Sequence, residues 1–239
     1  MTPNPQAPVQ KKGLSPIVWV LLGCGGLALL IFLGFFIAGA LLVRQVKNMA
    51  DGITDPAAKE ANVKGMLGTV PQGYYPAITF SLPMVMDMAM LTDVPFNMDG
   101  GPNDFQHAFL YFRVISTDET KKVRDFFDGK TQSTDTLRKS GIQVDAKDIL
   151  KRGTVKTAAG LTVKYVATRG GVSAANSANA DKAQLEGLNT LLSFECPGDT
   201  ALRIGTWTEK EETPHVDLTG TVADESQITT FVGPLTPCG

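Results

Sequence analysis

The most unusual local pattern in the sequence is a run of methionines at alternate positions: Met84, Met86, Met88 and Met90. Residues two apart share one face of a β-strand, so a strand here would carry four thioethers side by side. Thioethers are soft ligands that suit Cu(I), and Met98 and His107 could add to such a copper site. Methionine also fills irregular apolar space, and the run has no neighbouring cysteine or pair of histidines. We therefore favour packing, or an apolar binding surface, and keep a copper-handling domain as the alternative function.

Other residues with catalytic potential do not form a recognised motif. His107 and His215 lie in no GxSxG or HExxH setting, and we interpret both as surface or strand-end residues. Gly129-Lys130-Thr131 resembles the end of a P-loop, but Arg124 stands where the first glycine belongs, which favours the end of a helix. Residues 99–104 offer oxygen ligands for calcium, yet they lack the twelve-residue pattern that ends in glutamate, which favours a plain turn. These patterns predict a protein that is not an enzyme and has no cofactor.

Two of the three cysteines, Cys196 and Cys238, lie in the C-terminal part of the chain, each beside proline and glycine. In an oxidising compartment we expect a disulfide between them, which the chain-entropy model values at about 4 kcal/mol. Two unpaired thiols are the alternative. The sequence has no CxxC and no Cys/His cluster, and hence no zinc signature.

A long uncharged run near the N-terminus predicts a membrane anchor. Residues 13–43 contain no charged side chain, which exceeds the roughly 20 helical residues that cross a bilayer. Trp19, near one end, suits the membrane interface. We predict a cytoplasmic tail at residues 1–13 and a transmembrane helix at residues 14–43.

The same run contains Leu21-Leu22-Gly23-Cys24, which resembles a bacterial lipobox and would make the protein a lipoprotein acylated on Cys24. A cleaved leader needs a short apolar core that ends at the cleavage site, whereas here the apolar residues continue well beyond Cys24. We therefore favour an uncleaved signal anchor, in which Gly34 and Ala38 form a small-xxx-small pair that could support a weak dimer. Basic residues are balanced on the two sides, and the short tail favours N-in topology with the C-terminal part outside the cytoplasm.

The charge of the remaining chain excludes some partners. Four of the 22 basic residues and none of the 24 acidic residues lie in residues 1–47, so residues 48–239 carry a net charge of −6. Nucleic acid and anionic lipid both need a concentrated basic surface, so neither is expected as the main partner. The partner is instead an unidentified protein or small molecule.

Beyond the predicted span, residues 44–72 are small, polar and broken by glycine and proline, which predicts a stalk or linker. Residues 73–239 predict a soluble domain. Its expected elements, in order, are strands at 74–83 and 108–116, a helix from 117 to a stop at 129, a short helix at 145–151, a hairpin of 153–157 with 161–168, a loop at 170–183, a hairpin of 188–195 with 201–208, and a helix that begins near 223. Strands joined by short turns and helices with one apolar face predict an α+β class, with a twisted antiparallel sheet flanked by helices.

This order of elements resembles the Mog1/PsbP-like fold over residues 74–238. The whole chain is also similar to bacterial proteins that have one N-terminal span, a small extracytoplasmic domain and no assigned activity. From the predicted anchor, the lack of a catalytic motif and this resemblance, we predict a non-enzymatic protein of the bacterial inner membrane whose extracytoplasmic domain binds a ligand or another protein.

Overall fold

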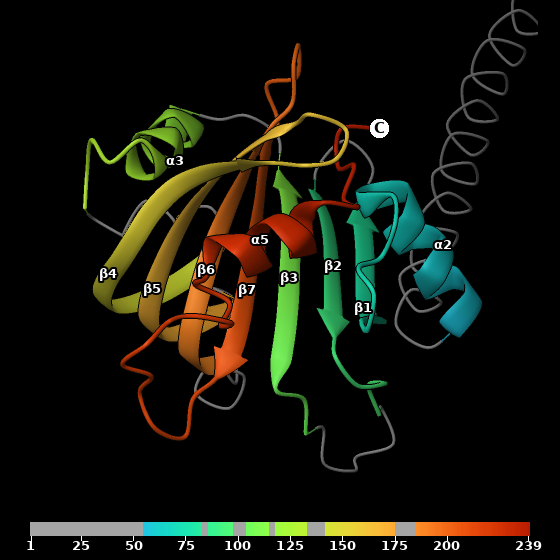
Figure 1. Cartoon of the computed structure of the whole chain (residues 1–239). Coiled ribbons are helices and arrows are strands. Elements are labelled where there is room, and N and C mark those ends of the chain that lie inside the picture. Colours follow the sequence, from blue (N-terminus) through green and yellow to red (C-terminus); the bar gives the residue numbers. More distant parts are fainter. Residues whose placement is uncertain (1–54, 83–85, 98–103, 115–117, 133–141, 175–184) are drawn as a thin grey trace, which may run out of the picture. The chain divides into compact units, whose positions relative to one another are not determined.

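A computed structural model of the chain describes residues 55–82, 86–97, 104–114, 118–132, 142–174 and 185–239 (Figure 1). All of them belong to the second of two compact units, Asn48–Gly239. The predicted tail, the predicted span at residues 14–43, Cys24, Gly34 and Ala38 lie outside the described residues. Among the residues that are described, no helix combines the length and the apolar character needed to cross a membrane.

The described part of the chain forms one sheet of seven strands with three helices, which confirms an α+β class that is mostly β. The elements in order are α2 (Pro56–Leu67), β1 (Tyr75–Leu82), β2 (Met86–Thr92), β3 (His107–Val114), α3 (Asp118–Phe127), β4 (Ile142–Lys156), β5 (Thr162–Ala174), β6 (Leu185–Glu195), β7 (Leu202–Lys210) and α5 (Glu225–Val232). The strand order is β1-β2-β3-β7-β6-β5-β4, and each neighbouring pair is antiparallel. The predicted hairpins, the helix after β3 and the terminal helix are all present.

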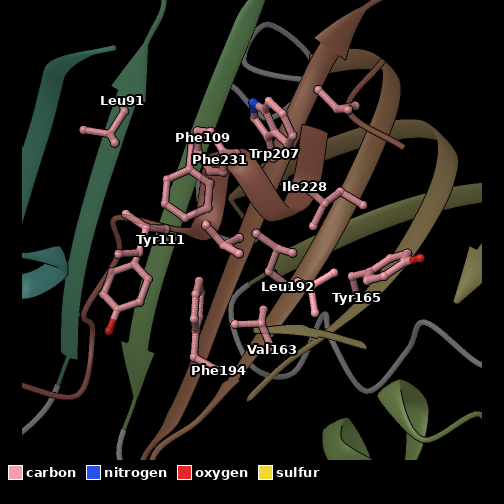
Figure 2. Close-up of a cluster of buried hydrophobic side chains, with 14 of the residues drawn as sticks. Leu91, Phe109, Tyr111, Val163, Tyr165, Leu192, Phe194, Trp207, Ile228 and Phe231 are labelled. Carbon is pink, nitrogen blue, oxygen red and sulfur yellow. The ribbon is translucent and has the colours of Figure 1, made fainter. Parts of the chain in front are cut away.

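Each face of the sheet has its own apolar core. The face that α2 and α5 cover, called the α5 face below, carries the larger core, which includes Leu91, Phe109, Tyr111, Val163, Tyr165, Leu192, Phe194 and Trp207 (Figure 2). The opposite face, called the α3 face, carries Phe112, Val166, Leu191, Leu202 and Ile204 beneath Val123 and Phe126 of α3. Neighbouring residues such as Leu191 and Leu192 go to different cores because side chains alternate across a strand.

Helix α5 packs on the sheet through aromatic contacts. Asp224 caps the helix by accepting a hydrogen bond from the Ser226 backbone N–H at 3.0 Å. The Phe231 ring stacks on Trp207 with a centroid distance of 4.2 Å and meets Phe109 edge to face at 5.0 Å. Trp207 Nε1 in turn donates to the Tyr74 hydroxyl at 2.7 Å, which satisfies the polar atom of a largely buried indole.

The prediction that residues 44–72 form a stalk is wrong for the part that the structure describes. Helix α2 begins after Asp55, whose carboxylate accepts the Ala57 N–H, and Pro56 occupies the first turn. Val63 and Leu67 lie four residues apart on one side of this helix and are fully buried in the core of the α5 face. The other residues of the helix are mostly alanines and polar residues that form no clear apolar stripe, so the sequence pattern is weak and only tertiary packing reveals the helix.

The short helix predicted at residues 145–151 is also wrong, because these residues belong to β4. They pair with β5, and the register shifts twice, between Ala146 and Asp148 and between Ile149 and Lys151. Such bulges interrupt the alternation of side chains and bend the strand, and Figure 1 shows β4 and β5 as strongly curved. Strand β5 likewise continues to Ala174, into the segment predicted as a loop at 170–183.

A matched pair of glycine substitutions tests this packing. A Cβ at Gly205 of β7 would lie 2.5 Å from Cε2 of the buried Phe109 ring, whereas a Cβ at Gly65 of α2 would meet nothing within 4 Å. We expect Gly205→Ala to lower the free energy of unfolding by about 1–3 kcal/mol through overpacking. Gly65→Ala should raise it by about 0.5–1 kcal/mol, because alanine loses less backbone entropy in a helix. Urea unfolding of the full chain in detergent measures both, and equal effects of the two variants would contradict the packing described.

Candidate functional site

A pocket of about 420 Å³ opens on the α5 face, between α2, one end of the sheet and the C-terminal segment. Its lining comes from three parts of the chain: Ala61, Asn62, Gly65 and Met66 of α2; Ser81, Asp87, Tyr111, Arg113 and Arg203 of the strands; and Pro237, Cys238 and Gly239. Pockets that bind small molecules have volumes of about 300–1,000 Å³ and a few polar groups that converge. This pocket has both properties.

Four polar residues form a row across the floor of the pocket. Strand register places Ser81 opposite Asp87, Asp87 opposite Arg113, and Arg113 opposite Arg203. The Ser81 hydroxyl donates to Asp87 Oδ1 at 2.6 Å, and Arg113 Nη1 donates to Asp87 Oδ2 at 3.2 Å. Arg113 and Arg203 are cross-strand neighbours of like charge, a pairing that destabilises a sheet when nothing offsets it.

Arg203 is the most unusual residue of this row. Its side chain is only 7% exposed, and its Nη2 donates to Asp199 Oδ2 at 2.6 Å. The Nε and Nη1 atoms of the same guanidinium are enclosed and make no hydrogen bond of good geometry among the described residues, and the Tyr111 hydroxyl is close enough to Arg203 to interact with it. Nearly all buried polar groups in proteins are paired, because an unpaired one loses its bonds to water without replacement. A hydrogen-bond acceptor beside Nε and Nη1 of Arg203 would therefore lower the cost of burying this guanidinium.

Two neighbours of Arg203 have shifted protonation equilibria. Burial raises the pKa of Tyr111 above its ordinary value, the positive charge of Arg203 opposes the rise, and Asp87 adds to it. The Tyr111 hydroxyl is therefore neutral at physiological pH and can donate a hydrogen bond. The Ala201 backbone N–H and the Arg203 guanidinium lower the pKa of Asp199, so Asp199 stays ionised.

The Cys196–Cys238 disulfide fixes one wall of the pocket. The two cysteines that the sequence pairs lie at bonding distance, with an S–S separation of 1.96 Å. Before Cys238, the Thr236 N–H donates to the Leu67 carbonyl at 2.8 Å, so the C-terminal segment is also held against α2. The lining residues Pro237, Cys238 and Gly239 are thereby anchored on both sides.

The methionine run pairs as a strand, on the face of the sheet opposite the pocket. In the β2–β3 register the cross-strand partners are Met86 with Val114, Met88 with Phe112, and Met90 with Leu110. The core of the α3 face contacts Met86 and Met88. Met84 and Met98 lie outside the described residues. In the described ranges, no group of three or more His, Cys, Asp or Glu side chains could hold a metal ion. Apolar packing accounts for Met86 and Met88.

The two histidines both lie close to the carboxylate of Glu209, a proximity that the sequence does not predict. His107 Nδ1 is 3.0 Å from Asp93 Oδ2, and its Nε2 is 3.9 Å from Glu209 Oε2. His215 Nε2 approaches the other Glu209 oxygen at 3.7 Å. His107 is six residues from Arg113 along β3, about 20 Å, so neither histidine lines the pocket.

The remaining sequence candidates have ordinary surroundings. Helix α3 ends at Phe127, and Gly129 follows with a φ of 74°. Gly129-Lys130-Thr131 therefore follows the end of a helix, as the sequence favours, and does not form a P-loop that leads into one. Lys130 pairs with Asp125 and Asp128 of the same turn. Of the calcium candidate, residues 99–103 lie outside the described residues, and Asp104 is exposed, 3.9 Å from Lys210.

The lowered pKa of Asp199 predicts a pH-dependent contribution to stability. Asp199→Asn removes the charge partner of the buried Arg203 and should lower the free energy of unfolding at neutral pH by about 1 kcal/mol, because the Asp199 side chain is 35% exposed and solvent screens the pair. The Asp199 contribution is complete above the unfolded-state pKa of about 3.9 and is lost as the pH falls through the lower folded-state pKa, so the two proteins should converge in acid. Urea unfolding between neutral pH and pH 3 measures this, with Asp104→Asn as the exposed control. A constant difference at all pH values would disprove the assignment.

Comparisons of the chain with protein-family models, with curated proteins and with solved structures found no match.

Proposed function

We propose that the chain is a single-pass membrane protein whose extracytoplasmic domain binds a small polar molecule and catalyses no reaction. The observation that carries the proposal is the pocket on the α5 face, where polar side chains from four strands form a row that ends at the buried Arg203. Neither histidine lines the pocket, so its serine lacks the base that most often activates such a hydroxyl, and the lining favours binding over nucleophilic chemistry.

The membrane location rests on the uncharged residues 13–43 and on the cysteine pair. A disulfide persists in oxidising compartments, so the bonding distance between Cys196 and Cys238 supports an extracytoplasmic domain.

The alternatives from the sequence have less support. Copper handling would rest on the methionine run, and packing already accounts for its described members Met86 and Met88. A lipoprotein acylated on Cys24 would place the same domain at the membrane and leave the binding proposal unchanged. The Mog1/PsbP-like resemblance rests, as before, on the order of the strands and helices.

The topology can be measured with reporter fusions after Gly239. We expect alkaline phosphatase, which folds only in an oxidising compartment, to be active there, and a cytoplasm-specific fluorescent reporter to be dark. Mass spectrometry of the unreduced protein from cells should find Cys196 and Cys238 in one linked peptide. Activity of the cytoplasmic reporter alone would overturn the location, and an N-terminal peptide that begins at acylated Cys24 would replace the anchor by a lipid.

Ligand binding can be tested by filling the pocket. Gly65 lines it and has open space around its Cβ position, so Gly65→Trp should occlude it, while Lys64→Trp on the exposed side of α2 is the control. The probes are glucose, glycine, succinate and inorganic phosphate at millimolar concentration, with thermal unfolding of the full chain in detergent as the measurement. At least one probe should raise Tm saturably in wild type and Lys64→Trp but not in Gly65→Trp. No saturable effect, or the same effect in Gly65→Trp, would refute the pocket as the binding site.

A further inference from the structure

Resting on the proposed binding function, we infer that the ligand carries a small oxyanion, a carboxylate or a phosphate group, held by Arg113 and Arg203. The free donors of Arg203, the second guanidinium opposite it, and the neutral hydroxyl of Tyr111 are the groups that would hold it. All three side chains line the same pocket.

Arg203 supplies donors that the protein leaves unused. A guanidinium carries five N–H groups, and Nε and Nη1 together hold three of them. With Nη2 bonded to Asp199, these three make no hydrogen bond of good geometry among the described residues; the Tyr111 hydroxyl is the one neighbour that interacts with the guanidinium as an acceptor, although the Arg203 side chain is 93% buried. Hydrogen bonds from a guanidinium to an anionic oxygen are stronger than those to neutral acceptors, so an oxyanion is the ligand group that offsets most of this cost.

Arg113 adds a second cation from the neighbouring strand. It lies directly opposite Arg203 in the β3–β7 register, and its side chain is 33% exposed, so it is accessible from the pocket. Each arginine has one carboxylate partner, Asp87 for Arg113 and Asp199 for Arg203. These two carboxylates balance the charges of the two arginines. An added oxyanion would accept hydrogen bonds from the unbonded donors and would offset the repulsion between the two guanidinium groups.

The enclosure of the site limits what the ligand can be. The Nε and Nη1 atoms lie behind the pocket surface, so an oxyanion reaches them only with a local shift of the lining side chains. A volume of about 420 Å³ fits a small metabolite, and it has no room for a nucleic acid strand or a protein surface. The net charge of −6 on residues 48–239 also disfavours polyanions.

The experiment measures binding of two oxyanions to the full chain in detergent, with inorganic phosphate and succinate as probes. Sodium chloride at matched ionic strength controls for screening, and glucose is the neutral probe. We expect at least one oxyanion to raise Tm saturably and to give a Kd by calorimetry, and the responding probe identifies phosphate or carboxylate as the group recognised.

The variants then assign the binding to the two arginines. Arg113→Gln should weaken the Kd of the responding oxyanion by about 10–100-fold, the value of one charge-assisted hydrogen bond. Arg203→Gln should abolish binding, and Arg203→Lys, which keeps the charge, separates loss of donors from loss of charge if Arg203→Gln does not fold. Lys64→Gln removes a charge from α2 outside the pocket and should leave the Kd unchanged.

The outcomes separate this inference from the proposed function. If neither oxyanion exceeds the chloride control, or Arg113→Gln binds as well as wild type, the oxyanion inference is overturned. Saturable binding of glucose or glycine that Gly65→Trp blocks would then leave the proposed function standing with a neutral ligand. If no probe binds, both the oxyanion inference and the proposed binding function are refuted.

Discussion

The pairing of β3 with β7 is the constraint on which the rest of the structure depends. In the described sheet, this ladder joins the β1-β2-β3 meander to the β7-β6-β5-β4 meander, from His107 opposite Glu209 to Val114 opposite Leu202. It brings together residues that lie more than 80 positions apart, so closing it costs more chain entropy than any hairpin of the sheet. One register then determines both polar clusters, since it places Arg203 opposite Arg113 at one end and Glu209 opposite His107 at the other.

The aromatic packing on the α5 face explains how this long-range pairing is stabilised. Phe109 of β3 and Trp207 of β7 face each other across the ladder, and Phe231 of α5 contacts both rings. Gly205 provides the room for the Phe109 ring. The helix thus covers the seam between the two meanders, and the segment that leaves it runs past α2 to Cys238 and its bond with Cys196. The same packing that holds the sheet together therefore positions the wall of the pocket.

Residues that are close in sequence predict much of the fold, whereas the features that depend on contacts between distant strands cannot be predicted from the sequence. The strands around Phe109 and Ile204, the two hairpins, α3 and α5 follow from residues close in sequence, as does the pairing of two cysteines beside proline and glycine. The sequence pattern of helix α2 is weak because Val63 and Leu67 are its main apolar contacts, and the pattern at residues 145–151 predicts a helix because bulges break the alternation of β4. The polar row was beyond prediction, since Arg113 and Arg203 become neighbours only through the β3–β7 register. One signal was present in the sequence: Arg203 is the single charge within the strand predicted at 201–208.

That single charge is informative because its burial is costly for the fold. A leucine or methionine at position 203 would fill similar space without a desolvation penalty, and replacing buried ion pairs by apolar residues often stabilises proteins. Asp199 satisfies only one nitrogen of the Arg203 guanidinium, and Arg113 beside it adds repulsion. A purely structural role would be served by a guanidinium with more of its donors bonded, as in Arg169, which binds Glu211 through Nε and Nη2 and the His215 carbonyl through Nη2. The difference between these two arginines of one sheet is the physical reason for the proposal that Arg203 serves ligand binding rather than the stability of the fold.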